Sequence, residues 1–90
     1  MSYRATRSDQ VVGQLARLPR PVIDAVESQI HLLEQNPRLH SRPAFVPLPT
    51  GQVSQLDYTF QGMDYLVDIV FRYGADEETL HLEYLFVETM

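Results

Sequence analysis

The spacing of the apolar residues changes half-way along the chain, and this change restricts the fold more than any other feature. In residues 8–36 apolar side chains recur every three or four positions, as on one face of a helix. In residues 56–87 they alternate with other residues, as on one face of a β-strand. Helices followed by strands indicate an α+β protein. Because ninety residues suffice for one domain only, we expect a single domain over residues 1–90.

Two helices are expected in the first half, after a short strand at Tyr3–Thr6. Ser8 can accept a hydrogen bond from a free backbone amide and so begin the first helix, which Pro19 ends. Pro21 suits the first turn of the second helix, and Asn36 followed by proline ends it. Helices linked this closely form a hairpin. Their predicted apolar stripes are Val11, Val12, Leu15 and Leu18 in the first helix, and Val22, Val26, Ile30 and Leu33 in the second.

Three strands are expected in the second half, after a proline-rich loop that Phe45, Val46 and Leu48 would hold onto the core. Turn residues at Gln61-Gly62 and in residues 74–78 separate the strands. Short connections force antiparallel pairing, so the strands form a meander whose apolar face the helical hairpin covers. The side chains predicted on that face are Leu56, Tyr58, Phe60, Tyr65, Val67, Ile69, Phe71, Leu80, Leu82, Tyr84 and Phe86.

The charges are divided unevenly between the two halves of the chain. The formal net charge is −5; residues 1–42 carry six arginines and four acids, whereas residues 43–90 carry one arginine and eight acids. An acidic half of this kind repels phosphate, which argues against non-specific nucleic-acid binding and suits a basic partner. The alternative is a solvated acidic surface that keeps the protein soluble.

The chain contains no cysteine, which excludes disulfides and thiolate chemistry and suits a reducing compartment. Its first residues lack the apolar core of a signal peptide, and no apolar run has the length of a membrane span. We therefore expect a cytoplasmic protein without a membrane anchor. The three histidines show no metal-ligand spacing and no phosphate-binding glycine loop occurs, so neither a metal nor a cofactor is expected.

The polar face of the predicted meander brings together five ionisable side chains, Asp57, Asp68, Arg72, His81 and Glu83. Arg72 lies near the end of one strand, and His81 lies near the start of the next. A catalytic hypothesis uses His81 as a base, Glu83 as the carboxylate that orients it and Arg72 as a phosphate-binding cation. We prefer a simpler interpretation, in which the exposed face carries cross-strand ion pairs such as Arg72 with Asp68 or Glu83.

The chain resembles the RelE/ParE toxin superfamily. The resemblance is carried by the run LARLP at residues 15–19, the run LEQNP at residues 33–37, and the run DYTFQGMDYLVDIVF at residues 57–71, where a glycine-containing hairpin leads into an apolar strand. It implies a helical hairpin packed on a meander. It also implies a toxin that cuts messenger RNA on the ribosome or poisons DNA gyrase, and an antitoxin that holds it inactive. The nucleases of this superfamily use strand arginines as phosphate clamps and a tyrosine or histidine near the C-terminus.

Two departures from that pattern leave enzymatic activity open. Leu66 stands where the resemblance would put a strand arginine, and residues 87–90 (VETM) lack basic residues. The first hypothesis is a toxin-like component of a type II toxin–antitoxin system with a cognate antitoxin, acting on translation by mRNA cleavage or on gyrase. The second is a catalytically inactive interaction module that dimerises or binds a basic partner. The acidic charge argues against RNA or the ribosome as a direct partner.

Overall fold

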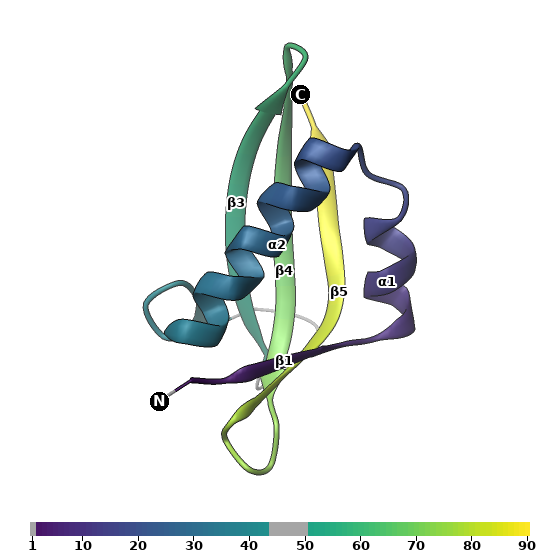
Figure 1. Ribbon diagram of the computed structural model, residues 1–90. Helices are drawn as coiled ribbons and strands as arrows, with labels where there is room; N and C mark the ends of the chain where they lie inside the picture. The colour runs from purple at the N-terminus through teal and green to yellow at the C-terminus, as the bar shows by residue number, and fades with distance from the viewer. Residues whose placement is uncertain (1, 44–50) are drawn as a thin grey trace.

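The computed structural model describes residues 2–43 and 51–90. It is an α+β protein with two helices and a five-stranded sheet, and Figure 1 shows their arrangement. Phe45, Val46 and Leu48, which we expected to hold the proline-rich loop, lie outside the described residues. The elements in chain order are β1 (Arg4–Arg7), α1 (Asp9–Leu15), α2 (Arg20–Gln35), β2 (Arg42–Pro43), β3 (Gln52–Phe60), β4 (Met63–Tyr73) and β5 (Thr79–Thr89).

The sheet has the strand order β1-β5-β4-β3-β2 and is mixed rather than purely antiparallel. The predicted meander is confirmed, because β3, β4 and β5 pair antiparallel with their sequence neighbours. The first strand was expected, but its pairing was not: β1 runs parallel to β5, with Arg4 opposite Thr79 and Arg7 opposite Leu82. Parallel pairing is available here because α1, α2 and three strands lie between β1 and β5 in the sequence.

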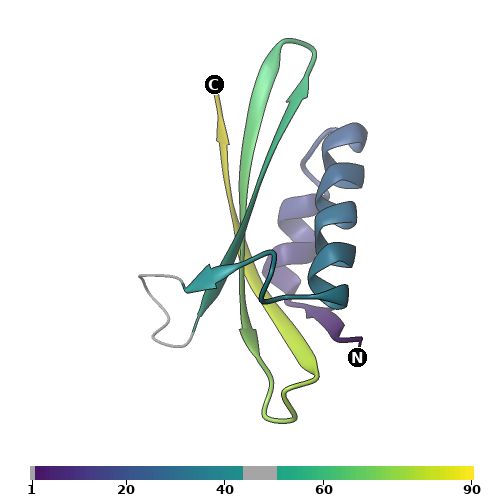
Figure 2. The ribbon, with the colours of Figure 1, turned by 90° about the vertical axis from the view of Figure 1, so that its left-hand side faces the viewer.

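Both helices lie on the same side of the sheet, as Figure 2 shows. Ser8 begins α1, and its side chain accepts a hydrogen bond from the Val11 amide at 3.2 Å. The helix ends at Leu15, earlier than Pro19, and Val12 is 54% exposed although we expected it on the apolar stripe. The stripe predicted for α2 is confirmed, since its buried residues are Val22, Val26, Ile30 and Leu33.

The core lies between the helices and the inner face of the meander. Alternate residues of β4 and β5 supply its sheet side, and the stripes of α1 and α2 supply the other side. Ser54 of β3 is also buried on this side, where the Gln29 side chain of α2 donates a hydrogen bond to it at 2.8 Å. The fully buried apolar side chains of the meander are Val67, Ile69, Phe71, Leu80, Leu82 and Leu85.

A β-bulge in β5 corrects the predicted core. Phe71 pairs with Leu82, but the preceding residue Val70 pairs with Tyr84, so Glu83 is an extra residue in β5. One extra residue reverses the alternation of the residues that follow it. Tyr84 and Phe86 therefore point away from the helices, and our prediction that they belong to the core is wrong. Leu85, which lies between them, points to the helix side and is 2% exposed, whereas Phe86 is 55% exposed.

The strand after the bulge is attached to α1 by one side chain. The Gln14 amide nitrogen donates to the Leu85 carbonyl at 2.7 Å, and the Leu85 amide donates to the Gln14 side-chain oxygen at 2.7 Å. Ser8 also donates to the Glu83 carbonyl at 2.6 Å. Beyond the end of β1, these side chains satisfy backbone groups of β5 that another strand would otherwise pair with.

The two predicted turns are confirmed. Gln61 and Gly62 have φ values of 53° and 76° and join β3 to β4 in a two-residue hairpin. The turn between β4 and β5 is closed by Asp76, whose carboxylate accepts from the amides of Glu78 and Thr79 at 2.9 and 3.0 Å.

Among the described residues, neither helix is long and apolar enough to cross a membrane.

Candidate functional site

The candidate site lies on the side of the sheet that faces away from α1 and α2, here called the open face. The strand register places the five predicted polar residues on this face, but it divides them between two groups instead of bringing all five together. The face has two ends with different residues. One lies near the β4–β5 turn and the other near the β3–β4 hairpin. The predicted polar residues are Asp57, Asp68, Arg72, His81 and Glu83.

Arg72, His81 and Glu83 form the first group, here called the Arg72 cluster. Arg72 on β4 lies opposite His81 on β5. The Arg72 Nε donates to Glu83 Oε1 at 2.5 Å, and the two side chains are 49% and 29% exposed. The ion pair that we preferred as the simpler interpretation is therefore present for Glu83. The bulge places Glu83 beside Arg72 rather than beside the histidine ring.

The residues that contact His81 differ from those in the catalytic hypothesis, in which Glu83 orients the ring. Its Nδ1 lies 2.9 Å from the Thr6 hydroxyl of β1. Its Nε2 lies close to Gly74, where an added Cβ would come within 3.0 Å of it. In this arrangement Thr6 orients the ring, and the Glu83 carboxylate is occupied by Arg72. Glu83 engages only the Nε of the guanidinium, so a phosphate could reach the Nη groups but would meet a positive charge that Glu83 offsets.

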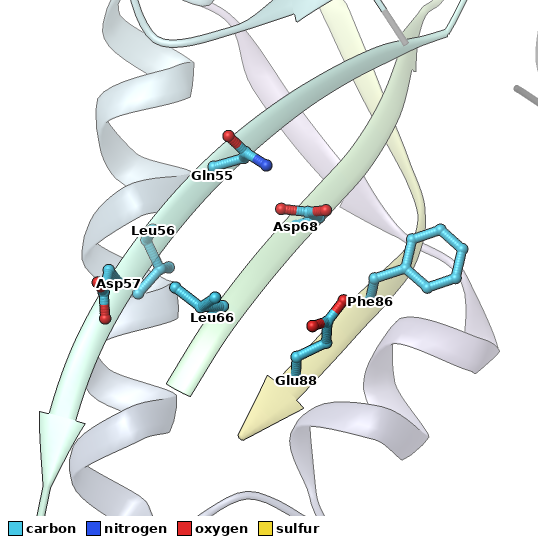
Figure 3. Close-up of a pocket in the computed structure, with 7 residues that line it drawn as sticks. All are labelled: Gln55, Leu56, Asp57, Leu66, Asp68, Phe86 and Glu88. Carbon is cyan, nitrogen blue, oxygen red and sulfur yellow. The ribbon is translucent and has the colours of Figure 1, made fainter. Parts of the chain in front are cut away.

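The second group is a hollow of about 360 Å³, here called the acidic groove, which Figure 3 shows in close-up. Leu66 lies at its centre, between Asp57 of β3 and Glu88 of β5 in one cross-strand row. The adjacent row contains Asp68 between a glutamine and Phe86. Three carboxylates thus surround one apolar side chain at spacings set by neighbouring strands. The lining residues are Gln55, Leu56, Asp57, Leu66, Asp68, Phe86 and Glu88.

Neither group is arranged as a metal site. Among residues 2–43 and 51–90, no three histidine, cysteine or carboxylate side chains come together in a way that could hold a metal ion. The strongest charge pairing lies on the other side of the sheet, where Arg7 of β1 donates to Glu27 of α2. The hydrogen bond from Arg7 lowers the pKa of the Glu27 carboxyl. This ion pair joins β1 to α2 and is remote from the open face.

Sequence reasoning missed two groove residues, Phe86 and Glu88. Parity placed Phe86 in the core, and Glu88 was noted only as part of a C-terminus without basic residues. A signal was available, because residues 84–87 (YLFV) are apolar at both parities and so do not define which side faces the core.

Comparison with known proteins bears on the fold. No protein-family model matches the sequence, and no curated protein matches it in sequence. The toxin–antitoxin complex RelBE2 from Mycobacterium tuberculosis is similar in structure, with a TM-score of 0.73 and 14% identity over 98% of this chain and 100% of that one. The chain has a RelE-like toxin fold.

Other solved structures agree with this fold assignment. A free-state mutant of E. coli toxin RelE matches 94% of this chain and 82% of its own, with a TM-score of 0.67 and 9% identity. The RelE–RelB complex from Pyrococcus horikoshii matches 94% of this chain and 93% of its own, with a TM-score of 0.57 and 21% identity. The predicted resemblance is confirmed for the RelE-like fold. Identities this low do not transfer the activity of those proteins.

Proposed function

We propose that the protein is the toxin-like component of a type II toxin–antitoxin system and that its cognate partner is an antitoxin. The observation that carries this proposal is the RelE-like fold, which spans 98% of the chain in the comparison with RelBE2. Of the similar structures described above, RelBE2 is a toxin–antitoxin complex by name, and that from Pyrococcus horikoshii is a RelE–RelB complex. A fold alone is a weak guide to chemistry, so the partner is the better supported part of the proposal.

For the mode of action, we propose cleavage of messenger RNA during translation, with gyrase as the alternative target. The Arg72 cluster would carry the cleavage. His81 would accept the proton of the attacking hydroxyl as its oxygen bonds to phosphorus, the ester oxygen of the next nucleotide would leave and take up a proton, and Arg72 would stabilise the charge on the phosphate. In the structure the Nε of Arg72 donates to Glu83 at 2.5 Å, so RNA would meet the Nη groups of an arginine whose charge is already offset. To orient the histidine, Glu83 would have to leave Arg72 and replace the Thr6 hydroxyl at Nδ1.

A second candidate is an inactive module that keeps the fold and only binds proteins, either another copy of itself or a basic partner. Two observations favour it. The Arg72 guanidinium is neutralised by Glu83, and the open face carries three carboxylates around Leu66, which repel a phosphate backbone. Under this candidate the protein binds a protein partner and does not cleave RNA.

Controlled expression in a bacterial host separates the two candidates. Growth and transcript integrity are compared for the wild type, the Arg72→Ala/His81→Ala variant and a matched control. The control is Arg20→Ala/His31→Ala, which removes the same residue types from exposed positions of α2. Arrest that only the first variant relieves would support catalysis by the Arg72 cluster. Normal growth with all three would refute a toxic activity of the chain and favour the inactive module.

A further inference from the structure

The acidic groove has features that the Arg72 cluster lacks. Its carboxylates form no ion pair within residues 2–43 and 51–90, whereas Arg72 is already paired with Glu83. Asp57, Asp68 and Glu88 come from three adjacent strands, so their positions relative to one another are fixed by the sheet. A ligand therefore meets a rigid arrangement of negative charges that needs little ordering on binding.

The centre of the groove is apolar. Leu66 lies between the carboxylates, and Phe86 presents a ring that is 55% exposed. The ring packs edge-on against Tyr84, with centroids 5.1 Å apart and an interplanar angle of 88°. That contact supports Phe86 from one side and leaves the other for a ligand. An exposed aromatic face beside carboxylates is suited to a guanidinium, which can stack on the ring and donate hydrogen bonds to an acid.

The combination of charge and apolar surface restricts the class of ligand. A nucleic acid is repelled by the three carboxylates and by the net charge of −7 in residues 43–90, where one arginine faces eight acids. A metal ion is disfavoured because Leu66 occupies the space between the acids. What fits is a peptide segment with cationic side chains on either side of an apolar one, since it satisfies both parts of the groove.

We propose that the acidic groove binds a short extended segment of a partner protein, in which arginine or lysine side chains flank an apolar side chain. The cationic side chains contact Asp57, Asp68 and Glu88, and the apolar side chain contacts Leu66 and Phe86. The identity of the partner as an antitoxin rests on the proposed function above. The chemistry of the groove does not depend on it.

The test uses the full chain and a defined probe. The probe is a short blocked peptide in which arginine and leucine alternate; control peptides replace the arginines by glutamate or the leucines by serine. Affinity is measured by titration calorimetry at two salt concentrations, and the backbone amide NMR spectrum locates the bound peptide. The groove variant is Asp57→Asn/Asp68→Asn/Glu88→Gln. The matched control, Asp24→Asn/Glu77→Gln/Glu78→Gln, loses the same charge at exposed positions elsewhere.

We expect the arginine–leucine peptide to shift the amides of residues 66–68 and 86–88 and to bind more weakly at higher salt. The groove variant should lose about tenfold or more in affinity, because three exposed charge contacts together are worth roughly that factor. The matched control should change little. Loss of binding in Phe86→Ala would confirm the apolar contact.

Three results would overturn the proposal: no binding of the arginine–leucine peptide, equal binding of the glutamate peptide, or equal weakening in the groove variant and the matched control. Such a result together with growth arrest in the expression experiment would leave the toxin-like role intact. Peptide binding without growth arrest would support the groove proposal and refute a toxic activity of the protein.

Discussion

At one end of the open face, an arginine lies against the carboxylate of Glu83; at the other end, three carboxylates surround Leu66. Both ends use β4 and β5, and the acidic groove also uses β3. The Arg72 cluster is neutralised by its own residues, whereas the acidic groove has its charges available. This difference indicates that the face is better prepared for a cationic segment than for a phosphate.

The bulge at Glu83 separates the two ends. Before it, β5 shows His81 on the open face; after it, the alternation is reversed and β5 shows Phe86 there. The same extra residue places a carboxylate beside Arg72 and an aromatic ring in the acidic groove. The contrast between the two ends can therefore be altered by changes in and around the bulge.

Leu85→Ala should have the largest effect. The bulge puts Leu85 on the helix side of the sheet and Phe86 on the open face. Leu85 is 2% exposed, so its loss from the core should cost about 3–5 kcal/mol in the free energy of unfolding. Chemical denaturation followed by circular dichroism measures this loss. The control is Phe86→Ala, which truncates a 55% exposed side chain on the other face of the sheet and should cost clearly less; equal losses in the two variants would contradict the role of the bulge.

Gln14→Ala should have the second largest effect. It leaves the amide and carbonyl of Leu85 without their two hydrogen bonds of 2.7 Å in a partly buried place. Unsatisfied backbone groups of this kind cost about 1–3 kcal/mol. The measurement is again the free energy of unfolding, with Gln10→Ala at an exposed position of α1 as the control. If both variants unfolded at the same denaturant concentration, the attachment of β5 to α1 would be unimportant.

Stability is expected to depend on pH through Asp76, in the turn between β4 and β5. Hydrogen bonds from the Glu78 amide and from Thr79 lower the pKa of Asp76 in the folded protein. As the pH falls, Asp76 therefore takes up its proton in the unfolded chain before it does so in the folded protein. The stability that these hydrogen bonds contribute is complete above the usual aspartate pKa, and it is lost as the pH falls through the lower pKa of the folded protein. The melting temperatures of the wild type and Asp76→Asn should therefore differ at neutral pH and converge in acid. A difference that stayed constant with pH would refute this assignment.

The smallest effect concerns the ion pair of the Arg72 cluster. A double-mutant cycle with Arg72→Ala and Glu83→Ala should give a coupling energy of about 0.5–1 kcal/mol, because both side chains are partly exposed. The comparison pair is Arg20 with Asp24, which lies 3.4 Å apart, is more exposed and should couple more weakly. A coupling near zero for Arg72 would show that the cation is available to a phosphate after all.

Most of the fold could be predicted from the sequence because its signals are local. The helix start at Ser8, the stripe of α2 and the hairpin at Gln61-Gly62 depend on neighbouring residues only. The parallel pairing of β1 with β5 and the bulge at Glu83 depend on residues far apart in the chain. No local pattern specifies them, and residues 84–87 are apolar at either parity.

The candidate site could be predicted only in part, because some of its contacts depend on the bulge. Regular alternation before the bulge placed Arg72 and His81 together, and the register confirms that pair. The extra residue affects the contact between Arg72 and Glu83 and determines the position of Phe86. The sequence therefore offered Glu83 only as one of two ion-pair partners for Arg72, and it did not place Phe86 in the groove. A strand whose apolar residues occupy both parities should be examined for a bulge before its faces are assigned.

The pairing of β1 with β5 also bears on the order of events during synthesis. Arg4 lies opposite Thr79, so the first strand leaves the ribosome long before its partner exists. Until β5 has been made, β1 has no strand beside it and the apolar stripes of both helices lack much of their cover. Distant pairing of this kind slows folding, since a long loop must close before the contacts form. The nascent chain therefore presents its apolar surface to chaperones, or to a partner bound during translation, before the open face is assembled.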